Sequence, residues 1–575
     1  MNATLTPTDS ARPVPAVRGR LRPLWMAPLW AHIALLAVVL ALLYPLMSPS
    51  SSYTSDEGAY ALQERSLERG SWAYDYRAGP LDPDGRAFPI ILSDRGDSGF
   101  FTYVKHPAYA LLLRGSTAVA GPVLGLHLPA LLGVVGTAIA AWLLAGQLDP
   151  RLRRPAFWLA ASGPVLLNGF LLWAHAPSAA LAGFALLGAA HLIVGVRGRW
   201  VMGAVVVAAL TGGVLLRSEG LLFAGALAVG LGAVVLRRDG ARRAAVLAAV
   251  AGLPPLVAAL LEREWVSSIM GASHETLVTR SGDGSSSFVA GRLSGAWHVL
   301  MQAHFGDPAA GLPLLLALVM VAGLGFVALR RWVPSSIGKL AIAVVLAAGF
   351  VALRFAGHPL DPVTGLLPAW PLAALGLLLF RWRGAAPVAR VLGGTGLLFA
   401  LAVLATQYPE GGGVEWGGRF LSPLTVPIAV VAAAGLLRAL EAVPGADRGR
   451  ATALLAALAL TTAVFAVASV GSLRDRQDDM VAAIARHPAT ITVTTRSSLP
   501  RLAWRADREV TWMLTDEAGL PGLLQHLRSE GVADVAVVTA VDVPLSDLGA
   551  YPVLKPVHEA ALTDNGLQLV VGLDR

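Results

Sequence analysis

The chain has 575 residues, of which 55% are hydrophobic and only 14% are charged, and its mean hydropathy is +0.62. Soluble domains carry about a quarter charged residues, so this composition excludes an ordinary soluble protein. The sequence contains no cysteine, which excludes disulfide bonds and thiolate metal sites, and its net charge is +8.

Thirteen long apolar runs divide the sequence. A helix needs about 20 apolar residues to cross the hydrocarbon core and satisfies its own backbone there, so each run predicts a transmembrane helix. The expected spans are residues 24–47, 127–148, 155–171, 178–196, 201–216, 220–236, 244–261, 311–329, 340–351, 365–380, 391–405, 426–440 and 451–470. The sequence therefore predicts an α-helical polytopic membrane protein with about 13 spans, its transmembrane domain covering residues 24–471.

Nearly every second gap between these runs is rich in arginine. Lys and Arg accumulate in short cytoplasmic loops, so these gaps predict the cytoplasmic side. They are the N-terminal segment 1–23 and the gaps that hold Arg151, Arg197, Arg237, Arg330, Arg381 and Arg448. An odd number of spans then places the C-terminus outside. Topology and attraction to anionic lipid head groups explain the positive net charge, so we predict no nucleic-acid partner.

Three segments on the opposite side are too long to be simple turns, and connections of this length are usually functional or fold by themselves. They are a first external loop at 48–126, a second at 262–310, and the C-terminal segment 472–575. The last of these predicts a small extracytoplasmic α/β domain. Its expected elements are strands at 489–495, 509–514, 534–539 and 567–571 and a helix at 522–528.

The first external loop opens with an acidic pair, Asp56-Glu57, at the start of a predicted helix. Neighbouring residues on a helix point about 100° apart, so the two carboxylates are expected to face different ways. Thr54-x-x-Glu57 is also a capping-box pattern, in which Glu57 satisfies free amides at the helix start. Both carboxylates are candidates for catalysis, with Asp56 favoured and capping as the alternative role of Glu57.

The same loop ends with Lys105-His106, followed by an apolar stretch from Ala110 to Gly121 that Arg114 interrupts. Such a stretch is typical of a helix lying along the membrane surface, where long basic side chains reach the head groups. Lys105 and His106 are then placed at the level of a lipid phosphate. The alternative is simple interfacial anchoring, because aromatic and lysine side chains collect at that level in any case.

Together these features resemble the GT-C glycosyltransferases, which use polyprenyl-phosphate sugars as donors and include aminoarabinose, arabinofuranosyl and protein mannosyl transferases. The resemblance depends on the early Asp56-Glu57 pair, on the motif from Lys105 to Tyr109, and on the many spans. It covers residues 24–470, and Ala108 stands where many members carry a second proline. It implies a GT-C-like fold in a bacterial plasma membrane, where cell-envelope glycans are built.

In that family an aspartate at the position of Asp56 looks like the catalytic base, and a lysine near Lys105 looks like a ligand of the donor phosphate. General-base catalysis agrees with this, since a carboxylate can take the proton of an attacking hydroxyl. The leaving lipid phosphate needs its charge neutralised more than it needs a proton, so one carboxylate and a few cations suffice. The expected outcome is sugar transfer with inversion at the anomeric carbon.

Other polar residues stand close to the external ends of spans, where ionisable groups are candidates for function. His175 lies in a Trp-x-His segment that resembles one of some family members, with a hydrogen-bonded loop histidine as the alternative. Arg419 lies in a Trp-Gly-Gly-Arg-Phe segment that resembles the Trp-Gly-x-Arg-Tyr of bacterial relatives. Arg217 and Arg419 are predicted phosphate ligands, with pairing to Glu219 and snorkelling as the respective alternatives. The remaining candidates are Glu219, His274, Glu275, His358 and Glu415.

The predicted partners are a polyprenyl-phosphate sugar, a glycan, lipid or protein acceptor, and membrane lipids. No spacing reads as a metal site, so no cofactor is assigned, although carboxylates such as Asp56 are suitable ligands for a divalent cation. The main rival function is a transporter or flippase of lipid-linked sugars. Transporters tend to have matched halves with broken helices, and the sequence shows no such symmetry. A third reading is a scaffold whose C-terminal segment binds a partner.

Overall fold

The protein is described by a computed structural model that covers residues 27–47, 52–90, 93–97, 99–102, 106–195, 198–271, 275–277, 288–302, 363, 365–406, 416–506, 509–544, 548–563 and 566–573. The predicted spans 311–329 and 340–351 lie outside the described residues, as does the N-terminal segment 1–23. So do four of the candidate site residues, namely Lys105, His274, His358 and Glu415. Glu275 is described by its backbone only.

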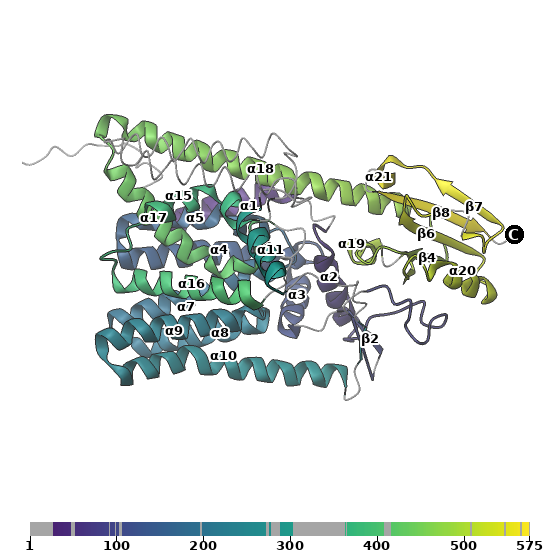
Figure 1. Cartoon of the computed structure of the whole chain (residues 1–575), viewed down its shortest axis with the longest axis horizontal. Helices are drawn as coiled ribbons and strands as arrows, with labels where there is room; N and C mark the ends of the chain where they lie inside the picture. Colours follow the sequence, from purple (N-terminus) through teal and green to yellow (C-terminus); the bar gives the residue numbers. More distant parts are fainter. Residues whose placement is uncertain are drawn as a thin grey trace, which may run out of the picture.

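A bundle of long apolar helices makes up most of the fold (Figure 1). Among the described residues, nine helical segments are long and apolar enough to cross a membrane. They are α1 (Leu29–Leu46), α4 (Leu124–Leu148), α7 (His175–Val194), α8 (Arg199–Leu216), α9 (Glu219–Asp239), α10 (Ala241–Met270), α16 (Pro387–Thr406), η3 with α17 (Arg419–Leu424 and Thr425–Glu441) and α18 (Gly445–Ala485). Each overlaps a predicted span, which confirms an α-helical polytopic membrane protein.

Two predicted spans are not the continuous helices that their apolar runs indicate. The run 155–171 is divided between α5 (Arg153–Ala161) and α6 (Pro164–Asn168), and the run 365–380 between α14 (Leu366–Ala369) and α15 (Pro371–Leu379). A proline begins the second helix of each pair. Proline has no backbone N–H, so it is tolerated in the first turn of a helix and breaks the interior. Hydropathy alone does not reveal these breaks.

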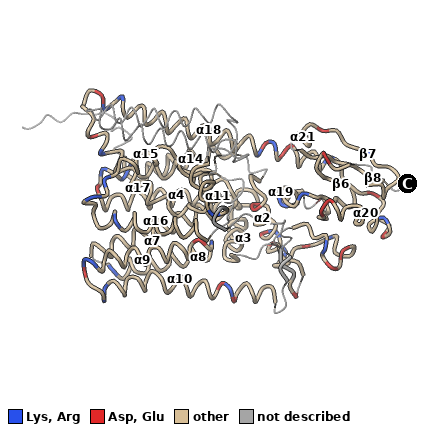
Figure 2. Tube along the Cα trace, in the orientation of Figure 1, with Lys and Arg blue, Asp and Glu red and all other residues tan. Residues whose placement is uncertain are grey.

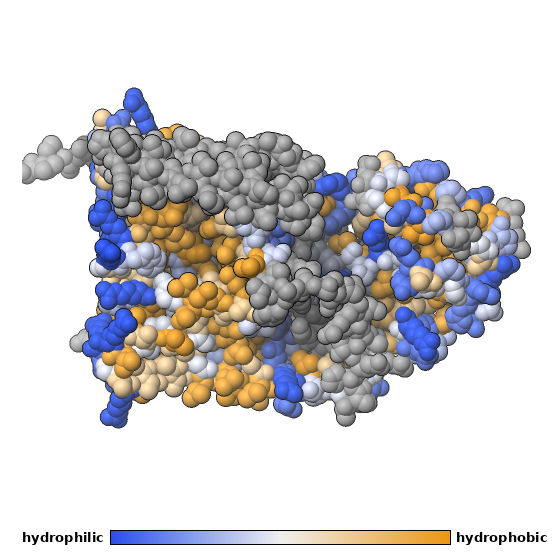
Figure 3. All heavy atoms as spheres, viewed as in Figure 1, coloured by the Kyte–Doolittle hydropathy of each residue, from blue (hydrophilic) through white to orange (hydrophobic). Residues whose placement is uncertain are grey.

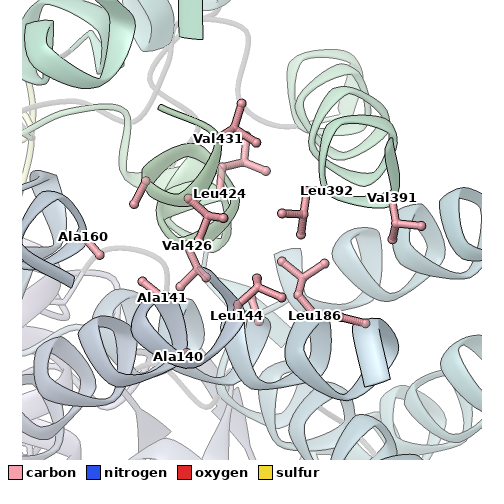
Figure 4. Packing of buried hydrophobic residues seen from close by; sticks show 14 of the residues in the cluster. Ala140, Ala141, Leu144, Ala160, Leu186, Val391, Leu392, Leu424, Val426 and Val431 are labelled. Atoms are coloured by element: carbon pink, nitrogen blue, oxygen red, sulfur yellow. The ribbon is translucent and has the colours of Figure 1, made fainter. Parts of the chain in front are cut away.

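The core of the bundle is packed with small and branched apolar side chains. Figure 4 shows Val426 of α17 among Ala140, Ala141 and Leu144 of α4 and Leu186 of α7, all of them buried. Small residues let membrane helices approach closely, because packing rather than water exclusion holds them together. The central helices α4, α7 and α17 therefore form a rigid support for whatever lies at their ends.

The first external loop forms a layer over one end of the bundle. It holds α2 (Ser55–Glu68), β1 (Ser93–Gly96), β2 (Gly99–Phe101) and α3 (Pro107–Ala120). From the second loop, β3 (Glu275–Leu277) pairs with β1 in a sheet of order β2-β1-β3, and α11 (Phe288–Met301) follows. Two loops that are far apart in sequence are thus joined by backbone hydrogen bonds.

The C-terminal segment folds around a five-stranded sheet of order β5-β4-β6-β8-β7. The strands are β4 (Ile491–Thr494), β5 (Trp512–Leu514), β6 (Asp534–Ala540), β7 (Val553–Val557) and β8 (Leu567–Leu573), with α19 (Leu499–Leu502), α20 (Leu520–Ser529) and α21 (Ala560–Thr563). Elsewhere in the chain, the short 3-10 helix η2 (Pro150–Leu152) connects α4 to α5. Strands β4, β5 and β6 are parallel, whereas β8 is antiparallel to both of its neighbours. We refer to residues 486–573 as the tail.

The tail packs directly on the first external loop. The backbone N–H of Leu514 donates to the carbonyl of Ala87 at 2.9 Å, and the Arg77 guanidinium donates to the carbonyl of Val510 at 2.7 Å. Ala78 and Ala87 are buried in the same hydrophobic cluster as Ile491 of β4. The loop therefore supplies part of the tail's interior.

The two ends of the bundle differ in charge. Lys and Arg gather at the end far from the C-terminus, and the visible flank of the bundle between the ends is mostly hydrophobic (Figures 2 and 3). At that far end Arg238 and Arg243 donate to the carbonyls of Ile193 and Leu192, at the end of α7. Helix α7 has 20 residues, which at about 1.5 Å per residue corresponds to about 30 Å, the thickness of a hydrocarbon core.

Candidate active site

Helix α2 begins with the acidic pair, and its two carboxylates face different ways, as the helical geometry predicts. Glu57 is 0% exposed, and its Oε1 accepts the backbone N–H of Thr54 at 2.8 Å, which confirms its capping role. The side chain of Asp56 is 43% exposed. Of the two, only Asp56 can meet a substrate from outside without a rearrangement of the helix.

Two arginines from distant parts of the chain hold Asp56. Arg419 Nη1 lies 3.1 Å from Asp56 Oδ2, and Arg501 Nη1 lies 3.5 Å from Asp56 Oδ1. Both arginine side chains are mostly buried, with 10% of each exposed. Arg419 belongs to the membrane bundle and Arg501 to α19 of the tail. In such an arrangement the exposed carboxylate can accept a proton, and the neighbouring arginines can stabilise an anion beside it.

The position of Arg419 is fixed by its backbone and by aromatic rings. Gly417 and Gly418 precede it with φ of 68° and 63°, a left-handed turn that favours glycine. The guanidinium Cζ lies 4.7 Å from the ring centre of Trp173 and 5.0 Å from that of Phe420. Such stacking is a favourable cation–π contact. It also shows that the Trp-x-His and Trp-Gly-Gly-Arg-Phe segments meet in space.

His175, the first residue of α7, is buried beside this arginine. Its ring lies 5.0 Å from the ring of Trp173, at an angle of 73°. Arg217 and Arg419 both act electrostatically on the imidazole. The structure thus brings together Asp56, Arg419, Arg217 and His175 at the end of the spans that faces the tail, while their predicted roles remain predictions.

The turn between α8 and α9 contains an ion pair. Arg217 Nη2 lies 2.7 Å from Glu219 Oε1, and Arg217 Nε donates to Glu219 Oε2 at 2.9 Å, which confirms that these two residues pair. Glu219 is almost fully buried and Arg217 mostly so. This pairing leaves a phosphate role for Arg217 untested, because a buried bidentate pair has to reorganise before the arginine can bind another anion.

His106 connects three segments. Its Nε2 accepts the backbone N–H of Ser218 at 3.2 Å, so Nδ1 carries the proton and donates to Glu262 Oε1 at 2.9 Å. Its backbone is left-handed, with a φ of 57°. Both ring nitrogens are engaged within the protein, so the predicted contact of His106 with a donor phosphate would require these bonds to break.

Beneath the exposed carboxylate lies a buried network centred on Arg474 of α18. Arg474 donates to the carbonyls of Met47 and Phe170, the latter at 2.7 Å, and its Nη2 lies 3.5 Å from Glu57 Oε2. Glu57 Oε2 also accepts the backbone N–H of Leu172 at 3.1 Å. Burial raises the pKa of Glu57, while Arg474 and the facing backbone N–H groups oppose that rise. The network joins α2 and α18 to the residues that follow α1 and α6.

Sequence reasoning missed both Arg501 and Arg474. Arg474 lies four residues beyond the end of the predicted span 451–470, where an arginine is readily taken for a head-group anchor. Arg501 lies in a tail whose contacts the sequence does not reveal. Within the described part of the chain, no three His, Asp or Glu side chains gather closely enough to hold a metal ion.

Gly58 shows how closely the tail approaches α2. A Cβ atom on Gly58 would lie 1.7 Å from the carbonyl oxygen of Arg501. We therefore expect Gly58→Ala to lower the free energy of unfolding by at least about 1–3 kcal/mol, the usual range for overpacking. Thermal unfolding in detergent checks this result. Gly115→Ala in α3 is the matched control, because a Cβ there meets nothing within 4 Å; equal melting temperatures for the two variants would contradict the expectation.

No protein-family model and no curated protein matches the chain. Among solved structures, it is similar to ArnT from Cupriavidus metallidurans bound to undecaprenyl phosphate, with a TM-score of 0.50 and 13% identity over 94% of this chain and 98% of that chain. It also matches the apo state of that protein, with a TM-score of 0.44, 14% identity and the same two coverages. The archaeal oligosaccharyltransferase AglB from Archaeoglobus fulgidus, in complex with an inhibitory peptide and a dolichol-phosphate, matches with a TM-score of 0.47 and 14% identity over 89% of this chain and 69% of that chain. The likeness to ArnT shows that the two proteins share a fold, in agreement with the fold that the sequence resemblance implies.

Proposed function

We propose that this protein is a membrane glycosyltransferase that moves a sugar from a polyprenyl phosphate to an extracytoplasmic glycan, lipid or protein acceptor. The observation that carries the proposal is the exposed carboxylate of Asp56, held by Arg419 at 3.1 Å at the outer end of the bundle. The fold shared with ArnT, whose structure is bound to undecaprenyl phosphate, supports a lipid-linked donor.

In the proposed reaction, Asp56 acts as the general base. Its carboxylate takes the proton of the acceptor hydroxyl while the hydroxyl oxygen forms a bond to the anomeric carbon. The bond from that carbon to the phosphate oxygen breaks, and its electron pair leaves with the lipid phosphate. A single displacement of this kind inverts the anomeric centre. Only one carboxylate is needed, because the phosphate leaves as an anion.

The proposed phosphate ligands are cations near Asp56. Arg419 is the first, because its guanidinium already binds a carboxylate oxygen and is held by Trp173 and Phe420. Arg217, in the turn between α8 and α9, would bind the phosphate after it releases Glu219. Lys105 remains a predicted ligand from the sequence. His106 is better placed to hold the end of the first loop in position, through Ser218 and Glu262.

The orientation of the protein follows from the charges at its two ends. We infer that the arginine-rich end faces the cytoplasm, because basic residues collect on that side. The acidic pair, the first loop and the tail then lie outside the plasma membrane of a bacterial cell. The donor reaches the site from within the bilayer, and the acceptor from the aqueous side.

The function is tested with purified protein in liposomes that contain polyprenyl-phosphate sugars, each carrying a radiolabel in the sugar. A glycosyltransferase is expected to release the label from at least one lipid and to leave the free polyprenyl phosphate behind. A flippase would move the intact labelled lipid between leaflets and leave the sugar attached. Movement without cleavage for every donor, in the presence of cell-envelope acceptors, would contradict the proposal.

Arg419→Met is expected to raise the KM for the donor by about 10- to 150-fold, the equivalent of losing one hydrogen bond to a charged group worth about 1.5–3 kcal/mol. Initial rates over a series of donor concentrations measure this effect. The control is Arg438→Met, which removes an arginine stacked on Phe380 near the other end of α17. A donor KM that changes equally in both variants would exclude Arg419 as a phosphate ligand.

A further inference from the structure

The tail reaches the candidate site through α19 and the residues that follow it. The carbonyl oxygen of Arg501 lies so close to α2 that Gly58 has room for no side chain. Immediately afterwards, Trp504 Nε1 donates to Ser52 Oγ at 2.7 Å, and Arg65 Nη1 donates to the carbonyl of Trp504 at 2.9 Å. Helix α19 is therefore fixed against the start of α2 by contacts on both sides of the acidic pair.

The close approach of the tail to α2 and the contact with Asp56 use different atoms of Arg501. Docking uses the backbone carbonyl of Arg501 and the side chains of Arg65 and Trp504. The Arg501 guanidinium instead extends to Asp56, with Nη1 3.5 Å from Oδ1, and the side chain is mostly buried. Burying an arginine needs a compensating partner.

We propose that Arg501 is a positioning residue for Asp56, so that the tail completes the active site of the membrane bundle. This inference rests on the proposed function. The two carboxylate oxygens of Asp56 are divided between two arginines, Oδ2 to Arg419 and Oδ1 to Arg501. When the donor phosphate takes Arg419, Oδ2 is released and can accept the proton of the acceptor. Arg501 then holds Oδ1 and keeps the carboxylate aimed at the reacting hydroxyl.

Arg419 and Arg501 have different proposed roles because they belong to different parts of the protein. Arg419 comes from the bundle, beside the bilayer through which the lipid donor arrives, and it is held by Trp173. Arg501 comes from the aqueous side, where no lipid phosphate has to enter. A displacement of a catalytic group by about 1 Å can lower the reaction rate about 100-fold. A second arginine bound to Asp56 would prevent such a displacement.

The test measures kcat and donor KM separately for Arg501→Ala in detergent or liposomes. We expect kcat to fall about 10- to 100-fold with the donor KM within about twofold of the original, because positioning acts on the reacting step. Arg501→Lys is expected to retain part of the rate. Added guanidinium chloride at non-denaturing concentration is expected to restore part of the kcat of Arg501→Ala, which a loss of docking would not allow.

Two controls separate positioning from folding and docking. Arg486→Ala removes an exposed arginine that pairs with Glu559 in the same tail, and it should leave kcat unchanged. Arg65→Ala weakens docking at Trp504 while keeping Arg501, and guanidinium should not rescue whatever rate it loses. A double variant of Asp56→Asn and Arg501→Ala should be no slower than Asp56→Asn alone, because Arg501 acts only through Asp56.

The outcomes also separate this inference from the proposed function. If Asp56→Asn abolishes transfer but folded Arg501→Ala transfers at the original rate, the inference is wrong and the function stands. A raised donor KM with unchanged kcat in Arg501→Ala would likewise overturn it, because Arg501 would then be a phosphate ligand. If the original protein transfers no sugar from any donor, the proposed function itself has failed.

Discussion

Asp56→Asn is expected to lower the rate of sugar transfer by about 10²- to 10⁴-fold, the usual contribution of a general base. Asparagine has nearly the same shape and keeps an oxygen that can accept a hydrogen bond from Arg419 or Arg501, but it cannot take a proton. The loss should therefore appear in the chemical step, with donor binding retained. Single-turnover assays with labelled donor, together with a donor-binding measurement, distinguish the two quantities.

The matched control for this variant is Asp75→Asn. Asp75 belongs to the same external loop, is more exposed than Asp56, and lies 3.5 Å from a single arginine, Arg69. Its replacement should leave transfer within about twofold, because exposed ion pairs contribute little. A rate for Asp56→Asn equal to that of the control would remove Asp56 from the catalytic role.

Arg474→Met is expected to lower the free energy of unfolding by about 3–5 kcal/mol, the usual cost of removing one partner of a buried ion pair. Glu57 would be left without its cation, and the carbonyls of Met47 and Phe170 would lose their donor. Adding Glu57→Gln should recover part of this loss, since it removes the unpaired buried charge, while its single amide oxygen can still accept the N–H group of either Thr54 or Leu172. Thermal and denaturant unfolding in detergent measure both variants.

Arg476→Met provides the comparison for that experiment, because it lies two residues further along α18 and is exposed. It should change stability by less than about 0.5 kcal/mol, as surface substitutions usually do. Equal free energies of unfolding for Arg474→Met and Arg476→Met would contradict a stabilising role of the buried network. So would a further loss of stability when Glu57→Gln is added to Arg474→Met.

The membrane part of the fold was largely predictable, because long apolar runs are the physical requirement for crossing a bilayer. The breaks before Pro164 and Pro371 were not predicted, since hydropathy averages over a run and does not register a missing N–H. In the tail, four predicted strands coincide with β4, β5, β6 and β8. Strand β7 was missed. It is an edge strand with no fully buried residue, and it contains the exposed Lys555 and Pro556.

The site was predictable in part, because its members are unusual for their place in the sequence. Asp56 and Arg419 are charged residues close to the ends of apolar runs, which is itself a signal. Their contact was not predictable, since 363 positions separate them and it depends on how α2 and η3 are placed in the folded chain. Arg501 is one of many arginines in a polar segment. Its importance follows from the docking of α19 on α2, which no local pattern encodes.

The sharing of a core between the tail and the first loop limits how this protein can be divided. Because Ala78 and Ala87 fill part of the interior beside the sheet, a fragment that begins at residue 486 would expose an unfilled apolar surface. Transplanting the tail onto a foreign scaffold would thus require residues 74–90 as well.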